Sequence, residues 1–172
     1  MKIILLGYMS CGKSTIGKIL SKFINIDFID LDDFIEEKYN SSLTEIFKTK
    51  GELFFRKIER LALLELLGSR KPFVLSLGGG TPCYYDNMDL LLETEKVKSF
   101  YLKSSLPKLV NRLEIEKEQR PLISHLDNKE VLTEFIGKHL FERSFFYNKA
   151  HFVIENDGDI EVVVEAIVAK LY

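Results

Sequence analysis

Residues 7–14 read Gly7-Tyr8-Met9-Ser10-Cys11-Gly12-Lys13-Ser14 and follow the apolar run Ile3-Ile4-Leu5-Leu6. They match the glycine-rich phosphate loop G-x-x-x-x-G-K-[ST] at every fixed position. Its glycines permit backbone conformations that let successive N–H groups line one concavity, and the N-terminus of the following helix adds positive potential. The pattern predicts a nucleoside triphosphate site. The alternative, a glycine-rich turn that opens an ordinary helix, seldom produces so full a match.

The composition limits the classes of protein to consider. With 172 residues, of which 46% are hydrophobic, the chain suits one globular domain spanning 1–172. The net charge is −2 without a block of Lys or Arg, so neither a nucleic acid nor a membrane is expected as partner. Cys11 and Cys83 lack metal-type spacing and are interpreted as free thiols in a reducing compartment. Without a leader-like or membrane-spanning segment, we expect a cytoplasmic protein, and a monomer.

Apolar runs alternate with helical patterns along the whole chain. The predicted strands are Lys2–Leu6, Phe28–Asp32, Phe73–Leu77, Val97–Leu102 and Phe152–Ile154. The predicted helices are Lys13–Phe23, Phe34–Tyr39, a short helix from a Ser42/Glu45 capping box to near Gly51, Glu52–Leu67, Asn87–Glu93, one capped by Ser105, Lys129–Tyr147 and Ile160–Leu171. This alternation predicts a three-layer α/β/α domain around a parallel sheet. Polar residues 114–128 are expected to form a long irregular segment that acts as a lid, and residues 32–67 to form an excursion from the core.

Two carboxylates stand at the end of the second predicted strand. In an extended chain, Asp30 and Asp32 point to the same side, where they can hold Mg²⁺ through water and accept a proton from an attacking hydroxyl. The alternative is that Asp32 or Asp33 caps the helix predicted from Phe34. A nearby phosphate loop favours the functional interpretation.

Three glycines follow the third predicted strand. Gly78-Gly79-Gly80 lets a ligand approach the backbone closely, although a flexible turn is the alternative. Ser76, just before them, is equally compatible with a place near Mg²⁺ and with a buried hydroxyl bonded to the backbone.

Four arginines are candidates for anion contacts. Arg143 shares a helical stripe with apolar residues, so it needs an anion, which is either a buried carboxylate or a bound carboxylate or phosphate. Arg56 has Glu59 three residues on, and a surface ion pair is its alternative. Arg120 lies in the predicted lid, where closure can bring its charge onto a transferring phosphoryl group. Arg112 lies off the apolar stripe and by itself indicates a solvated side chain.

Six ordered motifs together resemble the shikimate kinase family over nearly the whole chain. They are Gly7–Thr15, F-I-D-L-D at Phe28–Asp32, G-E-x-x-F-R-x-I-E at Gly51–Glu59, L-S-L-G-G-G at Leu75–Gly80, R-P-L at 120–122 and E-R-x-x-x-Y at Glu142–Tyr147. The phosphate loop is common to many kinases, whereas the combination is far more specific.

The resemblance implies ATP-dependent phosphorylation of the 3-hydroxyl of shikimate, with Mg²⁺ as cofactor, in the biosynthesis of chorismate and aromatic amino acids. It implies a P-loop kinase fold with five parallel strands in the order 2-3-1-4-5. The catalytic residues that match by position are Lys13, Asp32 and Arg120, and the metal residues are Ser14 and Asp30. The ATP-binding residues that match are Ser10, Cys11, Gly12, Lys13, Ser14, Thr15, Arg112 and Arg120. The substrate-binding residues that match are Asp32, Arg56, Gly78, Gly79, Gly80 and Arg143, with Phe47, Phe55 and Glu59 shaping the pocket.

The chain departs from the family pattern at two places. Ser10-Cys11 stands where the family usually has smaller residues such as Gly-Ala or Gly-Ser, and residues 155–158 lack the basic character of some members. Two rival functions are considered. One is another small-metabolite kinase of this fold, such as a gluconate or nucleotide kinase, and the other is a nucleotide-binding regulator without turnover. The retained Lys13 and Asp32 count against the regulator.

Overall fold

The computed structural model describes residues 1–120 and 122–172. Residue 121, the proline of the R-P-L motif, lies outside them. The strands are β1 (Lys2–Leu6), β2 (Asp27–Asp30), β3 (Phe73–Ser76), β4 (Val97–Lys103) and β5 (Phe152–Glu155). The helices are α1 (Lys13–Phe23), α2 (Leu31–Tyr39), α3 (Leu43–Gly68), α4 (Asn87–Glu93), α5 (Leu106–Glu116), α6 (Lys129–Tyr147) and α7 (Ile160–Val168), with short 3₁₀ turns η1 (Thr81–Cys83) and η2 (Lys117–Gln119).

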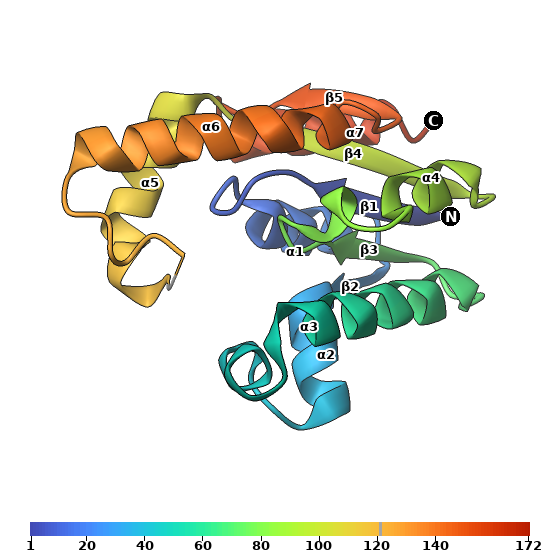
Figure 1. Cartoon of the computed structure of the whole chain (residues 1–172). Coiled ribbons are helices and arrows are strands. Elements are labelled where there is room, and N and C mark those ends of the chain that lie inside the picture. The colour runs from blue at the N-terminus through green and yellow to red at the C-terminus, as the bar shows by residue number, and fades with distance from the viewer. Residues whose placement is uncertain (121) are drawn as a thin grey trace.

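The strands form one parallel sheet in the order β2-β3-β1-β4-β5 (Figure 1). The central strand β1 pairs with β3 on one side and β4 on the other, and Ile3–Leu6 are fully buried. A strand covered on both faces reads as a continuous apolar run, which is why this segment could be recognised in the sequence. The predicted class and strand order are confirmed.

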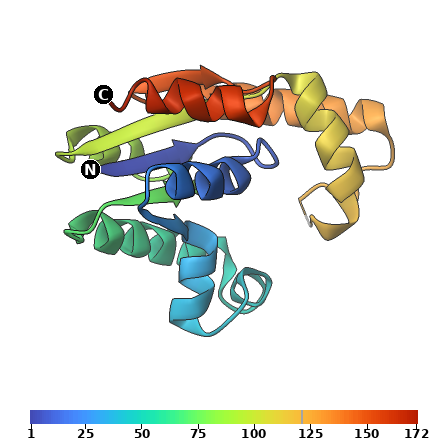
Figure 2. The same cartoon turned by 180° about the vertical axis from the view of Figure 1, so that it is seen from behind.

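Helices cover both faces of the sheet. In Figure 1, α3, α4 and α6 lie in front of the strands, and in Figure 2, seen from behind, α1 and α7 lie in front, while α2 lies beyond the β2 edge and packs against α3. The loop after β1 stands at the carboxyl ends of the strands, where ligands of open α/β sheets bind. In both views the α2–α3 connection and the α5–α6 connection project beyond the sheet on this same side.

The prediction that Asp30 and Asp32 share an extended strand is wrong. β2 ends at Asp30, whose side chain accepts a 3.1 Å hydrogen bond from the backbone N–H of Asp32 and so caps α2. Asp32 therefore lies in the first helical turn. An aspartate that satisfies a free N–H at a helix start competes with strand extension. The helix cap expected of Asp32 or Asp33 belongs to Asp30.

Other local features also differ from the predictions. The two helices expected on either side of Gly51 are joined in α3, with a kink at Gly51 (φ 80°). Part of the segment 114–128 is helical, because α5 runs to Glu116 and η2 follows it. Ser105 occupies the N-cap position of α5 without a side-chain capping bond, and its own N–H donates to Asp157. Within the described residues, each helix is too short or too polar to span a bilayer.

Candidate active site

The phosphate loop wraps around the side chain of its own lysine. Gly7 (φ 147°) and Gly12 (φ 100°) adopt conformations that few L-residues reach, and Gly12 is the N-cap of α1. Lys13 Nζ is buried and donates to the carbonyl oxygens of Gly7 at 3.0 Å and Tyr8 at 2.9 Å. The lysine is thus held inside the loop, next to the concavity where phosphates are expected.

Side chains remote in sequence fix the backbone of the loop. Asn156 is buried, and its Nδ2 donates to the carbonyl oxygen of Cys11 at 2.5 Å. Arg112 NH1 donates to the carbonyl oxygen of Ser10 at 2.9 Å. Arg112 is therefore not the freely solvated side chain that its helical position indicates. The bond from Asn156 was missed in the sequence, because 145 residues separate it from Cys11.

A cavity of about 460 Å³ opens beside the loop. Its lining includes all the predicted ATP-binding and metal residues, together with Asp32, Gly78, Gly79, Lys108, Glu116 and Asn156. Lys108 and Glu116 are additional polar residues here that the sequence motifs did not indicate. A cavity lined by backbone N–H groups, Lys13 and two arginines is suited to a polyphosphate.

Three oxygen atoms form the candidate metal centre. Ser14 Oγ donates to Asp30 Oδ2 at 2.6 Å and lies 3.4 Å from Ser76 Oγ. Hydroxyl and carboxylate oxygens fit Mg²⁺, which binds through few protein ligands and completes its shell with water and phosphate oxygens. Among the described residues, no group of three or more His, Cys, Asp or Glu is placed to hold a metal. The oxygen atoms of Ser14, Asp30 and Ser76 therefore suit a metal ion that arrives with a nucleotide.

Asp32 is the ionisable group with the clearest perturbation in the cavity. Burial, followed by the nearby charges of Asp30 and Glu59, raises the pKa of Asp32 to about 6. A carboxylate with a pKa nearer to neutrality is a stronger proton acceptor than an ordinary aspartate. Asp32 is thus suited to orient a hydroxyl group and to accept its proton.

The triple glycine Gly78–Gly80 lies against four charged side chains, those of Asp32, Glu59, Arg143 and Arg56. A Cβ on its first residue would come within 3.2 Å of Asp32 Oδ1, and one on its second within 3.3 Å of Arg143 NH1. A Cβ on the third would come within 2.7 Å of Arg56 NH2. The backbone here is thus the meeting point of one candidate base and two guanidinium groups. This close approach argues against an ordinary flexible turn.

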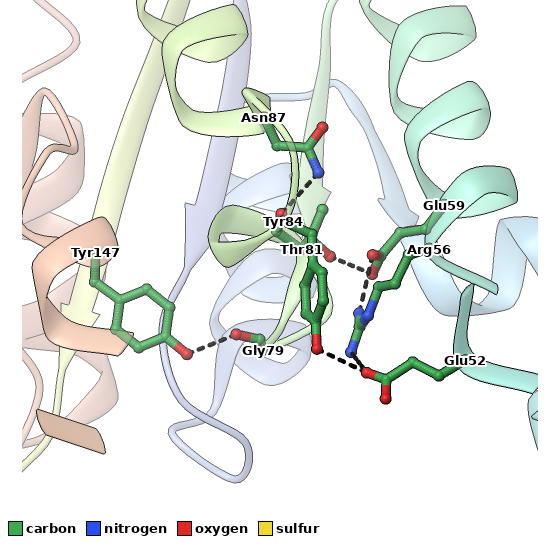
Figure 3. Close-up of polar contacts among 8 residues, drawn as sticks. All are labelled: Glu52, Arg56, Glu59, Gly79, Thr81, Tyr84, Asn87 and Tyr147. Atoms are coloured by element: carbon green, nitrogen blue, oxygen red, sulfur yellow. Dashed lines mark hydrogen bonds and ion pairs between the residues drawn. The ribbon is translucent and has the colours of Figure 1, made fainter. Parts of the chain in front are cut away.

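Arg56 is held by a polar network (Figure 3). Its NH1 donates to Glu59 Oε2 at 2.9 Å, and Glu59 is almost fully buried. Thr81 Oγ1 donates to the other Glu59 oxygen at 2.6 Å. The predicted Arg56–Glu59 pair exists, but it is internal rather than a surface pair. Tyr84 and Glu52, which also contact Arg56, had no recognisable signal in the sequence.

Arg143 approaches the site from α6. Its guanidinium carbon lies 5.8 Å from the ring centre of Tyr8, and the hydroxyl of Tyr147 donates to the carbonyl oxygen of Gly79 at 2.6 Å. Across residues 1–120 and 122–172, no carboxylate forms an ion pair with Arg143. Of the two anions considered, this favours a bound one over a buried side chain.

Arg120 pairs with a carboxylate at the cavity wall. Glu116 Oε2 accepts hydrogen bonds from Arg120 Nε at 2.8 Å and NH2 at 2.5 Å, and from Ser10 Oγ at 2.7 Å. Ser10 adopts a left-handed backbone conformation (φ 60°). The unusual serine of the loop thus contacts the predicted lid, a contact between residues 106 positions apart that the sequence could not reveal.

The remaining predicted pocket residues lie beyond the cavity lining. Phe47 and Phe55 pack with ring centres 4.5 Å apart, and Phe47 is partly exposed. Like Arg56, Glu59, Gly80 and Arg143, they do not line the 460 Å³ cavity. Glu59, Arg143 and Arg56 instead contact the triple glycine, whose first two residues also line the cavity. The residues predicted to bind the nucleotide and those predicted to bind the acceptor therefore meet at the triple glycine.

The sheet is parallel in the order 2-3-1-4-5, and the cavity beside its phosphate loop is lined by a candidate base. Two further arginines contact the triple glycine, part of which also lines this cavity. Together these features define a P-loop kinase. Comparisons with known proteins narrow this class. The family model described as shikimate kinase matches residues 9–172. The chain belongs to the shikimate kinase family.

Individual relatives agree with this assignment. A shikimate kinase of Flavobacterium johnsoniae is 51% identical over 96% of each chain, and one of Flavobacterium psychrophilum is 46% identical over 95% of each. The crystal structure of shikimate kinase from Bacteroides thetaiotaomicron has a TM-score of 0.90 at 37% identity and covers 99% of this chain and 98% of its own. The Acinetobacter baumannii enzyme in complex with shikimate has a TM-score of 0.83 at 28% identity, covering 99% of this chain and 92% of its own.

Proposed function

We propose that this chain transfers the γ-phosphoryl group of ATP to the 3-hydroxyl of shikimate. The observation that carries the proposal is the triple glycine, which meets Asp32, Arg143 and Arg56 beside the phosphate-loop cavity. Shikimate has one carboxylate and three hydroxyl groups. Two arginines can bind the carboxylate, while Asp32 orients the reacting hydroxyl group and accepts its proton.

Each polar residue then has a role in the transfer. Lys13 and Arg120 stabilise negative charge on the phosphoryl group as it moves in line from ADP to the acceptor. Arg112 contacts the nucleotide base, as the resemblance implies. Ser14 and Asp30 would hold Mg²⁺, which supplies charge neutralisation on the phosphate oxygens when it is bound. Arg56 and Arg143 hold the acceptor and take no part in proton transfer.

The finer organisation is also proposed. Residues 1–172 act as one domain, residues 32–67 form the acceptor-binding region and residues 114–128 form a lid that excludes water from the reacting phosphate. The net charge of −2 supports a protein that binds neither nucleic acid nor membrane. Cys11 and Cys83 as free cysteines fit the cytoplasm, and a monomer contains all the groups that the mechanism requires.

One rival has a structural neighbour of its own. A gluconokinase from Sinorhizobium meliloti has a TM-score of 0.54, but at 17% identity this likeness concerns the fold alone. Gluconate also carries a carboxylate and hydroxyl groups, so the acceptor has to be tested directly.

The test is a coupled assay of ADP release from the purified chain with Mg-ATP. Shikimate, quinate, gluconate and AMP are compared as acceptors at equal concentrations, and the product is located by ³¹P NMR. We expect turnover with shikimate and phosphate on its 3-oxygen. Turnover with gluconate or AMP and none with shikimate would refute the proposal, and nucleotide binding without any turnover would favour the regulator.

A further inference from the structure

Tyr84 covers the guanidinium group of Arg56. The guanidinium carbon lies 4.0 Å from the centre of the Tyr84 ring, closer than its 5.1 Å distance from the Phe55 ring. A cation at this distance over an aromatic face is attracted by the ring's electrons, and the ring also keeps water from that face. The ring therefore stabilises Arg56 in one plane, with 11% of its side chain exposed.

The hydroxyl group of Tyr84 adds a second constraint. It donates to Glu52 Oε1 at 2.7 Å, and the same oxygen accepts a longer bond of 3.4 Å from Arg56 NH2 (Figure 3). The hydrogen bond from Tyr84 lowers the pKa of the Glu52 carboxyl group. Glu52 is half exposed, so its own attraction for Arg56 is weak. Tyr84 thus links the two residues more firmly than their direct contact does.

The position of Tyr84 in the fold makes this contact rigid. Tyr84 follows η1, the 3₁₀ turn that begins directly after the triple glycine. Asn87, buried three residues later, donates to the carbonyl oxygen of Thr81 at 2.7 Å, and Arg60 of α3 donates to Asn87 Oδ1 at 2.8 Å. The segment carrying Tyr84 is therefore tied to the helix that carries Arg56.

We propose that Tyr84 is a positioning residue for acceptor binding: it holds the Arg56 guanidinium, by its ring and through Glu52, in the plane that receives the carboxylate of the acceptor. The proposal rests on the proposed function, since it assumes that Arg56 binds this carboxylate. An arginine ordered before the ligand arrives loses less conformational entropy on binding. Tyr84 takes no part in phosphoryl transfer, so its effect falls on the Michaelis constant of the acceptor.

The experiment compares Tyr84→Leu, Tyr84→Phe and the wild type in the ADP-release assay with shikimate. Tyr84→Leu is expected to raise KM for shikimate about tenfold, near the upper end of what a partly dehydrated cation–π contact supports. Tyr84→Phe keeps the ring and removes only the hydroxyl group. It should raise KM for shikimate about twofold, the effect expected from the loss of one modest hydrogen bond. KM for ATP and kcat should change less than twofold in both variants. Tyr85→Leu is the matched control, because this neighbouring tyrosine is 61% exposed, and it should leave KM for shikimate unchanged.

A double-mutant cycle separates positioning of Arg56 from a general loss of structure. In an Arg56→Lys background the planar guanidinium is absent, so Tyr84→Leu should change kcat/KM for shikimate less than twofold. The inference would be overturned if Tyr84→Leu lowered kcat/KM for shikimate by the same factor in both backgrounds. It would also be overturned if Tyr84→Leu raised the Michaelis constants of shikimate and ATP equally, or had no effect. Wild-type protein without turnover on shikimate would instead refute the proposed function.

Discussion

Gly80 and Arg56 are in such close contact that a single methyl group on the glycine would come within 2.7 Å of NH2 and 2.8 Å of NH1 of the arginine. The guanidinium cannot easily retreat, because Glu59 binds its other side and Tyr84 covers its face. The absence of a side chain at position 80 therefore leaves room for the Arg56 guanidinium.

Gly80→Ala is expected to raise KM for shikimate about tenfold or more, because overpacking of roughly 1–3 kcal/mol displaces the guanidinium. KM for ATP should change little, since the phosphate-loop cavity does not include Gly80. Gly68→Ala at the end of α3 is the control, as its Cβ would meet no atom within 4 Å. Steady-state kinetics with each substrate varied in turn checks the prediction, and an unchanged KM for shikimate would contradict it.

The fold was largely predictable from local patterns. β1 and α1 have the predicted bounds, because a continuous apolar run and an apolar stripe at helical spacing each specify one kind of element. The start of α2 was not predictable in the same way, because the capping bond from Asp32 N–H to Asp30 moves the boundary by three residues. Local hydrogen bonds of aspartate can decide between strand and helix, and apolar periodicity does not record them.

The candidate site was predictable only in part. Motif residues such as Lys13, Ser14 and Asp30 converge because the loop and the strand ends are adjacent in any fold of this class. Glu116 and Asn156 were missed, since their partners Ser10 and Cys11 lie more than a hundred residues away. No spacing in the sequence encodes such contacts; only the packing of α5 and the chain after β5 against the loop produces them.

Protonation of Asp32 should lower kcat/KM for shikimate at acidic pH. With a pKa raised to about 6, the carboxylate is increasingly protonated below that pH and can no longer accept the proton. We expect kcat/KM for shikimate to fall about tenfold per pH unit below 6 and to level off above it. Asp32→Asn should nearly abolish turnover while binding of ATP, followed by calorimetry, is largely retained. Weak ATP binding by this variant would instead place Asp32 chiefly at the metal or nucleotide.

The same carboxyl group should make the folded state less stable as pH rises. Its pKa is about 6 when folded, against 3.8 for an unperturbed aspartate, so between these values the folded chain holds more protons than the unfolded one. The contribution of Asp32 to stability is thus fully present below about pH 4 and is lost as pH rises through 6. At pH 7, Asp32→Asn should be more stable than the wild type by about 1–3 kcal/mol. Urea unfolding at pH 4 and pH 7 tests this, and a difference that does not grow with pH would contradict it.

Glu116→Gln is expected to lower KM for ATP. Glu116 binds Arg120 and Ser10 at the wall of the cavity, so its negative charge both repels a triphosphate and occupies the arginine. Because the pair is partly exposed, the gain should be modest, about two- to fivefold. Glu118→Gln, a change of the same type at an exposed position two residues on, should leave KM for ATP unchanged. A higher KM for ATP in Glu116→Gln would show that the carboxylate helps nucleotide binding rather than hindering it.

Arg143→Ala should weaken acceptor binding more than any change around Tyr84. The guanidinium of Arg143 lies against Tyr8 and the triple glycine without a carboxylate partner in the described residues, so its charge is free for a bound anion. Losing one partner of a desolvated charge pair commonly costs about 2–5 kcal/mol, which corresponds to a loss of about thirtyfold or more in kcat/KM for shikimate. KM for ATP should be nearly unchanged. Arg70→Ala removes an equal charge from an exposed position and should have no effect on either substrate. If Arg143→Ala leaves KM for shikimate at the wild-type value, the arginine serves the packing of α6 and the acceptor carboxylate is held elsewhere.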